Sequence, residues 1–302
     1  MANLFNEEEL QILKNEHFTT NFDSETMKNI LQEIKNFKVR ETDVIVAGYP
    51  RCGTTWTQEM VWLIANDLNF EKAKIFIDER FPNLEVIGFN MKQNPAITIP
   101  EYYSDSIKFI ERMTDPRFYK THVKPSLLPD QILTGQVKPK MIYVHRDVKD
   151  ACLSSYHYLK NVVKLYDGPL ENYYKHYILK DGLLGNFWES VLYFWKRRHE
   201  ENVLFITYEE MKNDLLEVVR RVATFLDKKL TGKQEIELSK WLEFKNCQNN
   251  PALNHNDIYK QSGFIRLGKI GQYTKEMSPE IIEKLDSWSK QCVEGSDYDY
   301  LN

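Results

Sequence analysis

VIVAGYPRCGTTWTQEMVWLIANDL, residues 44–68, joins a strand, a short loop and a helix. Residues 44–47 form a continuous apolar run, which is typical of a strand buried on both faces of a sheet. From Trp56 to Leu68 apolar residues recur at helical spacing, so we expect a helix to begin near Thr54 or Thr55. The loop at 48–55, GYPRCGTT, therefore follows the carboxyl end of a buried strand.

This loop has the pattern of a phosphate-binding loop with one substitution. Two glycines bracket four residues and hydroxyl residues follow, but Thr54 stands where Lys is usual, and the cation, Arg51, lies inside the loop. The first N–H groups of a helix lack partners and attract an anion. Gly53 permits close approach of the backbone, and Arg51 supplies charge. The loop predicts an anion site; an ordinary strand-to-helix turn is the alternative.

Strand and helix signals alternate along the rest of the chain. Strands are expected near 118–122, 141–144 and 203–207, and helices from about 149 and over 215–226. This alternation predicts an α/β fold: a single domain, 1–302, with a central, mostly parallel sheet covered by helices on both faces. Ligands of such sheets bind beyond the carboxyl ends of the strands, which places the 48–55 loop, residues 120–122, Arg146 and Tyr208 on one rim.

Two segments fall outside this alternation. Residues 1–40 are polar with helical stretches, and we expect them to form an entry segment packed on the core. Residues 165–187 hold four tyrosines and three glycines without a clean period. They predict a long loop with short helical pieces that acts as a lid over an apolar ligand, or else a surface loop.

Composition excludes several classes of function. The chain has 42% hydrophobic and 28% charged residues and a net charge of −4, which argues against general nucleic-acid binding. We expect no membrane segment, because no long apolar run and no signal segment is present. The four cysteines, Cys52, Cys152, Cys247 and Cys292, lack the spacing of a zinc or redox site. We therefore expect no metal, reduced thiols and a cytoplasmic location.

Four motifs, taken together, resemble the cytosolic sulfotransferases over nearly the whole chain. The family's YPKSGTTW motif matches 49–56, its KTH motif matches 120–122, and its RxxKDxxxS motif matches 146–154. The run YEEMK at 208–212 matches a fourth motif, whereas the family's C-terminal RKGxxGDW is only partly kept at 266–273.

The resemblance implies a donor, 3′-phosphoadenosine 5′-phosphosulfate (PAPS), and a product, adenosine 3′,5′-bisphosphate (PAP). By motif, the loop residues Arg51, Cys52, Gly53, Thr54 and Thr55 would hold the 5′-phosphosulfate; Arg146, Ser154, Arg266 and the backbone at Gly268 would hold the 3′-phosphate; and Trp56, Tyr208 and Phe244 would contact adenine. Leu267 stands where the family carries a phosphate-binding cation. Arginine suits phosphate because it presents paired donors.

The resemblance also implies in-line transfer to a hydroxyl of a small, hydrophobic acceptor. His122 would be the general base, and Lys120 and Arg51 would stabilise charge on the transferring group and on the leaving oxygen. Arg51 replaces the family's Lys, so sulfation followed by elimination, as in a retinol dehydratase of this family, is a variant. A small-molecule kinase and a catalytically weak nucleotide or hydrophobic-ligand binder are the other readings.

The acceptor and the assembly are less defined by sequence. Phe81, Asn83, Val86, Tyr156 and the 165–187 segment are the expected acceptor walls, and they fit phenols, flat alcohols or sterols. The family's dimerisation segment is not recognisable at 274–283, so a monomer or a non-standard dimer is expected. Cys52, at a helix N-terminus beside Arg51, is expected to have a lowered thiol pKa, and its oxidation to block donor binding.

Overall fold

The computed structural model describes residues 24–86, 100–179, 184–254 and 264–300. Its sheet has four parallel strands in the order β2-β1-β3-β4, with bounds β1 Val44–Ala47, β2 Phe118–Thr121, β3 Lys140–His145 and β4 Val203–Thr207. β1 is central: Val46 is in register with Lys120 of β2 on one side and with Ile142 of β3 on the other. The predicted α/β fold with a parallel sheet is confirmed.

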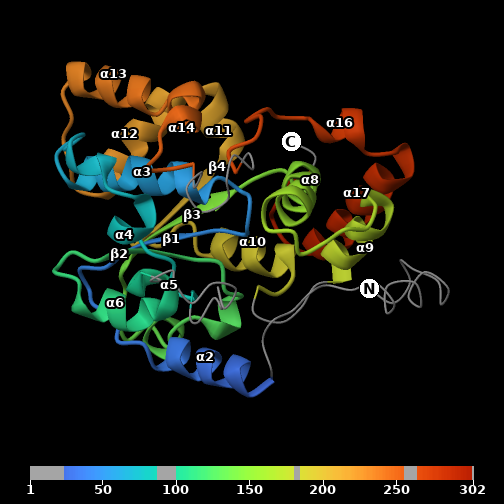
Figure 1. Ribbon diagram of the computed structural model, residues 1–302, viewed down its shortest axis with the longest axis horizontal. Coiled ribbons are helices and arrows are strands. Elements are labelled where there is room, and N and C mark those ends of the chain that lie inside the picture. The colour runs from blue at the N-terminus through green and yellow to red at the C-terminus, as the bar shows by residue number, and fades with distance from the viewer. Residues whose placement is uncertain (1–23, 87–99, 180–183, 255–263, 301–302) are drawn as a thin grey trace.

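Helices cover both faces of this sheet (Figure 1). They are α2 Ser24–Asn36, α3 Thr54–Ala65, α4 Ile77–Arg80, α5 Glu101–Ser104, α6 Ser106–Arg112, α7 Asp130–Leu133, α8 Val148–His157, α9 Leu170–Leu179, α10 Phe187–Lys196, α11 Tyr208–Asn213, α12 Leu215–Phe225, α13 Gly232–Trp241, α14 Phe244–Asn249, α16 Tyr273–Glu276 and α17 Pro279–Val293. Short 3-10 turns lie at Lys72–Lys74 and Pro125–Leu127, and a π-helical turn, η3, covers Tyr158–Val162.

The side-chain alternation of the central strand divides the core in two. Val44 and Val46 belong to a cluster with α3 and α12, whereas Ile45 and Ala47 belong to a second cluster with α8, α9, α10 and α17. Successive strand residues point to opposite faces, so one four-residue strand anchors both layers. This explains why β1 reads as an uninterrupted apolar run rather than as an alternating one.

The tyrosine-rich segment at 165–187 is largely part of the core. Leu170–Leu179 forms α9, and Tyr173, Tyr174 and Tyr177 are buried in the second cluster. Tyr173 donates to Ser155 Oγ at 2.7 Å, which ties α9 to α8. The three rings are therefore not acceptor walls. Residues 180–183 lie outside the described ranges, and the lid role of the whole segment stays a prediction.

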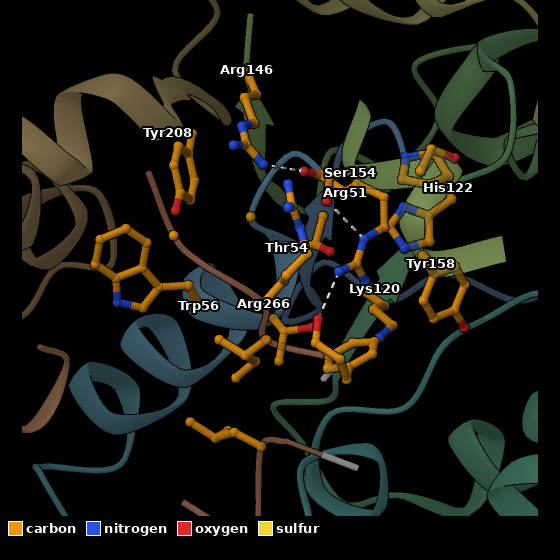
Figure 2. Close-up of a pocket in the computed structure, with 18 of the residues that line it drawn as sticks. Arg51, Thr54, Trp56, Lys120, His122, Arg146, Ser154, Tyr158, Tyr208 and Arg266 are labelled. Carbon is orange, nitrogen blue, oxygen red and sulfur yellow. Dashed lines mark hydrogen bonds between the residues drawn. The ribbon is translucent and has the colours of Figure 1, made fainter. Parts of the chain in front are cut away.

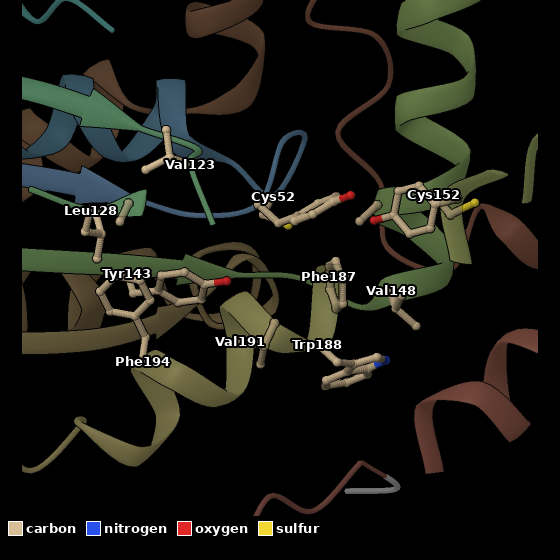
Figure 3. Packing of buried hydrophobic residues seen from close by; sticks show 14 of the residues in the cluster. Cys52, Val123, Leu128, Tyr143, Val148, Cys152, Phe187, Trp188, Val191 and Phe194 are labelled. Carbon is tan, nitrogen blue, oxygen red and sulfur yellow. The ribbon is translucent and has the colours of Figure 1, made fainter. Parts of the chain in front are cut away.

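Cys52 is also a core residue, and the expectation of a lowered thiol pKa is wrong. Its side chain is fully buried in the second cluster, to which Tyr143 and Cys152 also belong (Figure 3). Burial disfavours the thiolate and raises the pKa well above its ordinary value, outweighing the opposite effect of Arg146. A buried thiol of this kind is poorly reactive, so we no longer expect its oxidation to control donor binding.

The N-terminal helix α2 packs on the second cluster through Ile30 and Ile34. Residues 1–23 of the expected entry segment lie outside the described ranges. Within those ranges, no helix is long and apolar enough to cross a membrane.

Candidate active site

A cavity of about 400 Å³ lies at the carboxyl ends of the strands (Figure 2). It brings together most of the residues that the sequence placed on one rim, although they are far apart in the chain. Its walls include Arg51, Gly53, Thr54, Thr55, Trp56, Lys120, His122, Arg146, Ser154, Tyr208, Phe244, Arg266, Leu267 and Gly268. Of the predicted donor-site residues, only Cys52 is absent from these walls, because its side chain faces the core.

The loop before α3 presents the helix N-terminus to the cavity. Gly53 is the N-cap with a φ of 106°, and no side chain of the described residues caps α3. A Cβ at Gly53 would lie 2.9 Å from Tyr208 Cδ2, so glycine is needed both for the turn and for the fit against Tyr208. The first N–H groups of α3 therefore face the cavity without a side-chain cap among the described residues, and their role as an anion site stays a prediction.

Arg146 is a buried cation in the wall nearest this loop. Its guanidinium lies over the Tyr208 ring at 4.4 Å and donates to the backbone oxygens of Arg51, at 3.3 Å, and Lys269, at 3.1 Å. Its Nε is buried and has no hydrogen-bond partner among the described residues. A buried donor without a partner costs free energy, so this atom fits a site completed by an anionic ligand.

The neighbouring His145 contributes no charge to this site. It is buried at the end of β3, and burial lowers its pKa to about 3, which keeps the ring neutral at physiological pH. Its Nε2 lies 2.8 Å from the Tyr298 hydroxyl, on the core side. Of these two adjacent residues, His145 therefore packs in the core and Arg146 lines the cavity as a cation.

The segment after residue 264 forms the opposite wall. Gly268 has a φ of 59°, and a Cβ there would lie 2.0 Å from the Phe244 ring, so the ring packs directly on this backbone. Gln248 Nε2 donates to the carbonyls of Ile265 and Arg266, which fixes the segment; sequence reasoning missed this residue. Leu267, where a cation was expected in the family, lines the cavity with an apolar side chain.

Arg266 is held by an ion-pair network. Its Nη1 lies 3.2 Å from Glu276 Oε1, and His157 Nε2 lies 2.6 Å from Glu276 Oε2. Partial burial alone would raise the pKa of the Glu276 carboxyl. His157 and Arg266 together outweigh this effect, so the pKa is lowered. Arg266 therefore meets the cavity in a defined position, tethered to α16.

Aromatic rings form the wall proposed for adenine. Trp56 and Tyr208 contact edge to face with ring centroids 5.6 Å apart, and Trp56 Nε1 donates to Leu242 O at 2.8 Å. Phe244 completes this wall against Gly268. A flat purine suits such a surface, since every base has a face for aromatic contact.

His122 stands on the other side of the loop. Its Nδ1 lies 2.6 Å from Gly48 O, and a carbonyl oxygen only accepts, so Nδ1 carries the proton. The basic lone pair of the neutral ring is then on Nε2. The His122 backbone N–H donates to Glu85 Oε1 at 2.8 Å, and burial raises the pKa of that carboxyl. Glu85 also lines the cavity, and sequence reasoning missed it.

Lys120, at the end of β2, is paired inside the cavity. Its Nζ lies 3.6 Å from Asp78 Oδ1, and Asp78 Oδ2 accepts from the Tyr103 hydroxyl at 2.7 Å. Both Asp78, on α4, and Tyr103, on α5, line the cavity and were missed by sequence reasoning. No strand-end signal marks them, because they lie on four-residue helices outside the alternating pattern.

Two of the four residues predicted as acceptor walls line the cavity, and their role toward an acceptor stays a prediction. Asn83 and Val86 line the cavity, and Asn83 forms a parallel bridge with Lys120. Phe81 is instead fully buried in the first core cluster, with its ring 5.7 Å from that of Phe118. Tyr156 faces away from the cavity and packs against Tyr166 and Tyr173.

Other cavity residues carried no sequence signal. Tyr158, Leu159, Leu184 and Phe264 belong to its walls, and all are apolar or aromatic residues that resemble core residues in the sequence. Leu184 is the cavity's contribution from the described part of 165–187. No group of three or more His, Cys, Asp or Glu residues in the described ranges could hold a metal ion.

A parallel α/β sheet with a glycine loop, three cavity arginines and an aromatic wall defines a protein built to bind an anionic nucleotide. The chain matches the sulfotransferase domain over residues 41–297 and belongs to this family, as the sequence resemblance implied.

Three relatives illustrate the range of the family. The luciferin sulfotransferase of Photinus pyralis is 42% identical over 88% of this chain and 76% of its own length. Sulfotransferase 1B1 of Canis lupus familiaris is 30% identical over 90% of both chains. The crystal structure of a retinol dehydratase in complex with androsterone and the inactive cofactor PAP superposes with a TM-score of 0.84 at 30% identity, covering 99% of this chain and 97% of that one. The predicted cofactor, PAPS with PAP as its product, agrees with this family membership.

Proposed function

We propose that this chain transfers a sulfuryl group from PAPS to a hydroxyl of a small, hydrophobic acceptor, with His122 as general base. The hydrogen bond between His122 Nδ1 and Gly48 O carries this proposal. It joins the imidazole to the first residue of the anion-binding loop and sets the tautomer in which Nε2 can accept a proton.

The residues proposed to hold the donor come from the 48–55 loop, from Arg146 and Ser154, and from the segment after residue 264. The N-terminus of α3, with Thr54 and Thr55, would hold the 5′ end of PAPS. Arg146 and Ser154, together with Arg266, would hold the 3′-phosphate, and the partnerless Nε of Arg146 supports this assignment. Trp56 and Phe244 would contact the adenine.

The proposed reaction is a single in-line displacement at sulfur. His122 Nε2 takes the acceptor proton while the acceptor oxygen forms a bond to sulfur. The bond between sulfur and the bridging oxygen breaks, and its electron pair stays on the 5′-phosphate of the bisphosphate product. Lys120 and Arg51 stabilise the charge that develops on the transferring group and on the leaving oxygen. The imidazolium then returns its proton to solvent.

The walls of the cavity support this acceptor class. Val86, Leu159 and Leu184 provide apolar surface, and Asn83 and Asp78 add polar groups. Such a wall suits a phenol, an alcohol or a sterol that presents one hydroxyl to His122. The fold likeness to a retinol dehydratase favours a second outcome, in which the sulfate ester of an allylic alcohol is eliminated after transfer.

Two measurements test this function. Thermal shift should show stronger stabilisation by PAP than by ADP, because only PAP carries a 3′-phosphate for Arg146, Ser154 and Arg266. A transfer screen with radiolabelled PAPS against phenols, sterols and allylic alcohols should then identify labelled ester or, after elimination, free sulfate with an alkene. Equal stabilisation by ADP, or Mg-dependent ATP turnover, would contradict the assignment.

A further inference from the structure

The Arg51 side chain is enclosed by aromatic rings. Its guanidinium carbon lies 4.7 Å from the Tyr158 ring centroid and 4.8 Å from that of Phe264. The two rings lie 5.9 Å apart and nearly perpendicular, with an interplanar angle of 75°. Figure 2 shows the Arg51 side chain among those of Ser154, His122 and Tyr158. Cation and rings therefore form one packed unit inside the cavity.

Two hydrogen bonds fix the plane of this guanidinium. Nε donates to Ser154 Oγ at 3.3 Å, and Nη2 donates to the backbone oxygen of Phe264 at 2.7 Å. Because Ser154 Oγ accepts this bond, its own hydroxyl hydrogen is left to donate in another direction. Arg51 thus links the loop, α8 and the 264–268 segment, which all belong to the predicted donor site.

The need for such a support follows from the chemistry of arginine. A lysine ammonium is a compact charge whose effect depends little on rotation, whereas a guanidinium directs its donors in one plane. Arg51 also has a φ of 72°, an uncommon backbone conformation for a residue with a side chain, which sets the direction in which the side chain leaves the loop. Tyr158 begins a π-helical turn directly after α8, a rare conformation that recurs at functional sites.

We propose that Tyr158 and Phe264 are positioning residues that fix the plane of the Arg51 guanidinium in the donor site, beside Ser154 and the 264–268 segment. The inference rests on the proposed function, because it assumes that a nucleotide 5′-phosphate lies at this loop. Neither aromatic residue belongs to the motifs that carry the family resemblance, which lie at 49–56, 120–122, 146–154, 208–212 and 266–273. The two rings act on the donor through Arg51, so their effect can be distinguished from a direct contact between either ring and the ligand.

A double-mutant cycle tests this coupling. Tyr158→Leu should weaken PAP binding by about tenfold, or about 1.4 kcal/mol, measured by calorimetry. kcat/KM for PAPS should fall by a similar factor. Tyr158→Phe keeps the ring and should restore both values. In an Arg51→Lys background, Tyr158→Leu should change PAP affinity by less than about threefold, because the ammonium does not need its plane fixed.

Two further variants keep the test decisive. Tyr193→Leu removes a tyrosine ring that contacts Arg197 at 5.1 Å on α10, outside the cavity, and should leave PAP affinity unchanged. Phe264→Leu should repeat the Tyr158→Leu result. Equal losses from Tyr158→Leu with Arg51 and with Lys at position 51 would overturn the inference. Wild-type protein that binds PAP but transfers nothing would contradict the proposed function alone, because the cycle is read from binding.

Discussion

The proposed donor end and the proposed acceptor end of the cavity are built differently. The donor end combines backbone with side chains: the N-terminus of α3, Gly53 and Gly268 bring main chain close to where phosphates would lie, beside Arg146 and Arg266. The acceptor end depends on side chains carried by short elements, such as Asp78 on α4 and Tyr103 on α5. Backbone contacts persist when a side chain is replaced, whereas a wall made of side chains can change its ligand readily. This difference fits a family with one donor and many acceptors.

The largest effect is expected at the junction of the two ends. His122→Ala should lower kcat by about 10²- to 10⁴-fold, the usual contribution of a general base. PAP affinity should stay within about twofold, because the imidazole is proposed to act on the acceptor. Rapid-quench transfer assays and calorimetry measure the two quantities. The exposed His199→Ala is the control. Near wild-type turnover without His122 would remove the imidazole from the mechanism.

The donor end should be sensitive to a single methyl group. Gly268→Ala places a Cβ 2.0 Å from the Phe244 ring, so the segment or the ring must move, and PAP affinity should fall by about 10- to 100-fold. Gly271→Ala is a matched control: its φ is 73°, but its Cβ would meet nothing within 4 Å among the described residues. Equal losses in both variants would show that backbone strain, not the Phe244 contact, is responsible.

A smaller effect is expected at the acceptor end. Asp78→Asn removes the charge 3.6 Å from Lys120 Nζ and should lower kcat by about threefold to tenfold, which corresponds to about 0.7–1.4 kcal/mol for the loss of this ion pair. PAP affinity should not change, which steady-state kinetics and calorimetry can compare. Tyr103→Phe keeps the charge and removes one hydrogen bond, so its effect should be smaller still. A loss of PAP affinity in Asp78→Asn would mean that the two ends are not independent.

The smallest effect concerns stability and pH. Burial raises the folded-state pKa of Glu85 above its unfolded value of about 4.5. Between the unfolded pKa and the raised folded pKa, the folded state holds more protons than the unfolded state. The contribution of Glu85 to the free energy of unfolding is therefore present at low pH and is lost as the pH rises through the folded pKa. Glu85→Gln should remove that loss.

Melting curves from pH 5 to 8 can measure this change. Relative to wild type, the melting temperature of Glu85→Gln should increase with pH by on the order of 1–2 °C. The exposed Glu201→Gln should follow the wild-type profile. Parallel curves for Glu85→Gln and wild type would show that the carboxyl does not titrate in this range.

The same contrast explains what could be predicted from sequence. The strands near 118–122, 141–144 and 203–207 and the start of α3 were predictable, because buried parallel strands and helices have clear periods. The donor end followed, since strand ends and glycine loops converge in any such sheet.

The acceptor end was only partly predictable. Whether a side chain lines the cavity depends on whether it is buried in the core instead, and burial depends on contacts between residues that are distant in the sequence. Phe81 and Asn83 are two residues apart, yet one packs on Phe118 in the core and the other faces the cavity. Cys52 shows the same limit: its place beside a helix N-terminus suggested a reactive thiol, but its side chain points to the opposite side of the loop. Asp78 and Tyr103 meet only through tertiary contact.

The donor cavity draws on residues spread from Arg51 to Lys269, because the parallel sheet gathers strand ends that are far apart in the chain. Nucleotide binding as proposed would need these segments together, so it would report that the parts of the chain that carry them have folded. Nucleotide at a hundred times its dissociation constant would add about 2.7 kcal/mol to the free energy of unfolding. In a cell, the supply of donor would then help to set how long this protein survives, as well as how fast it works.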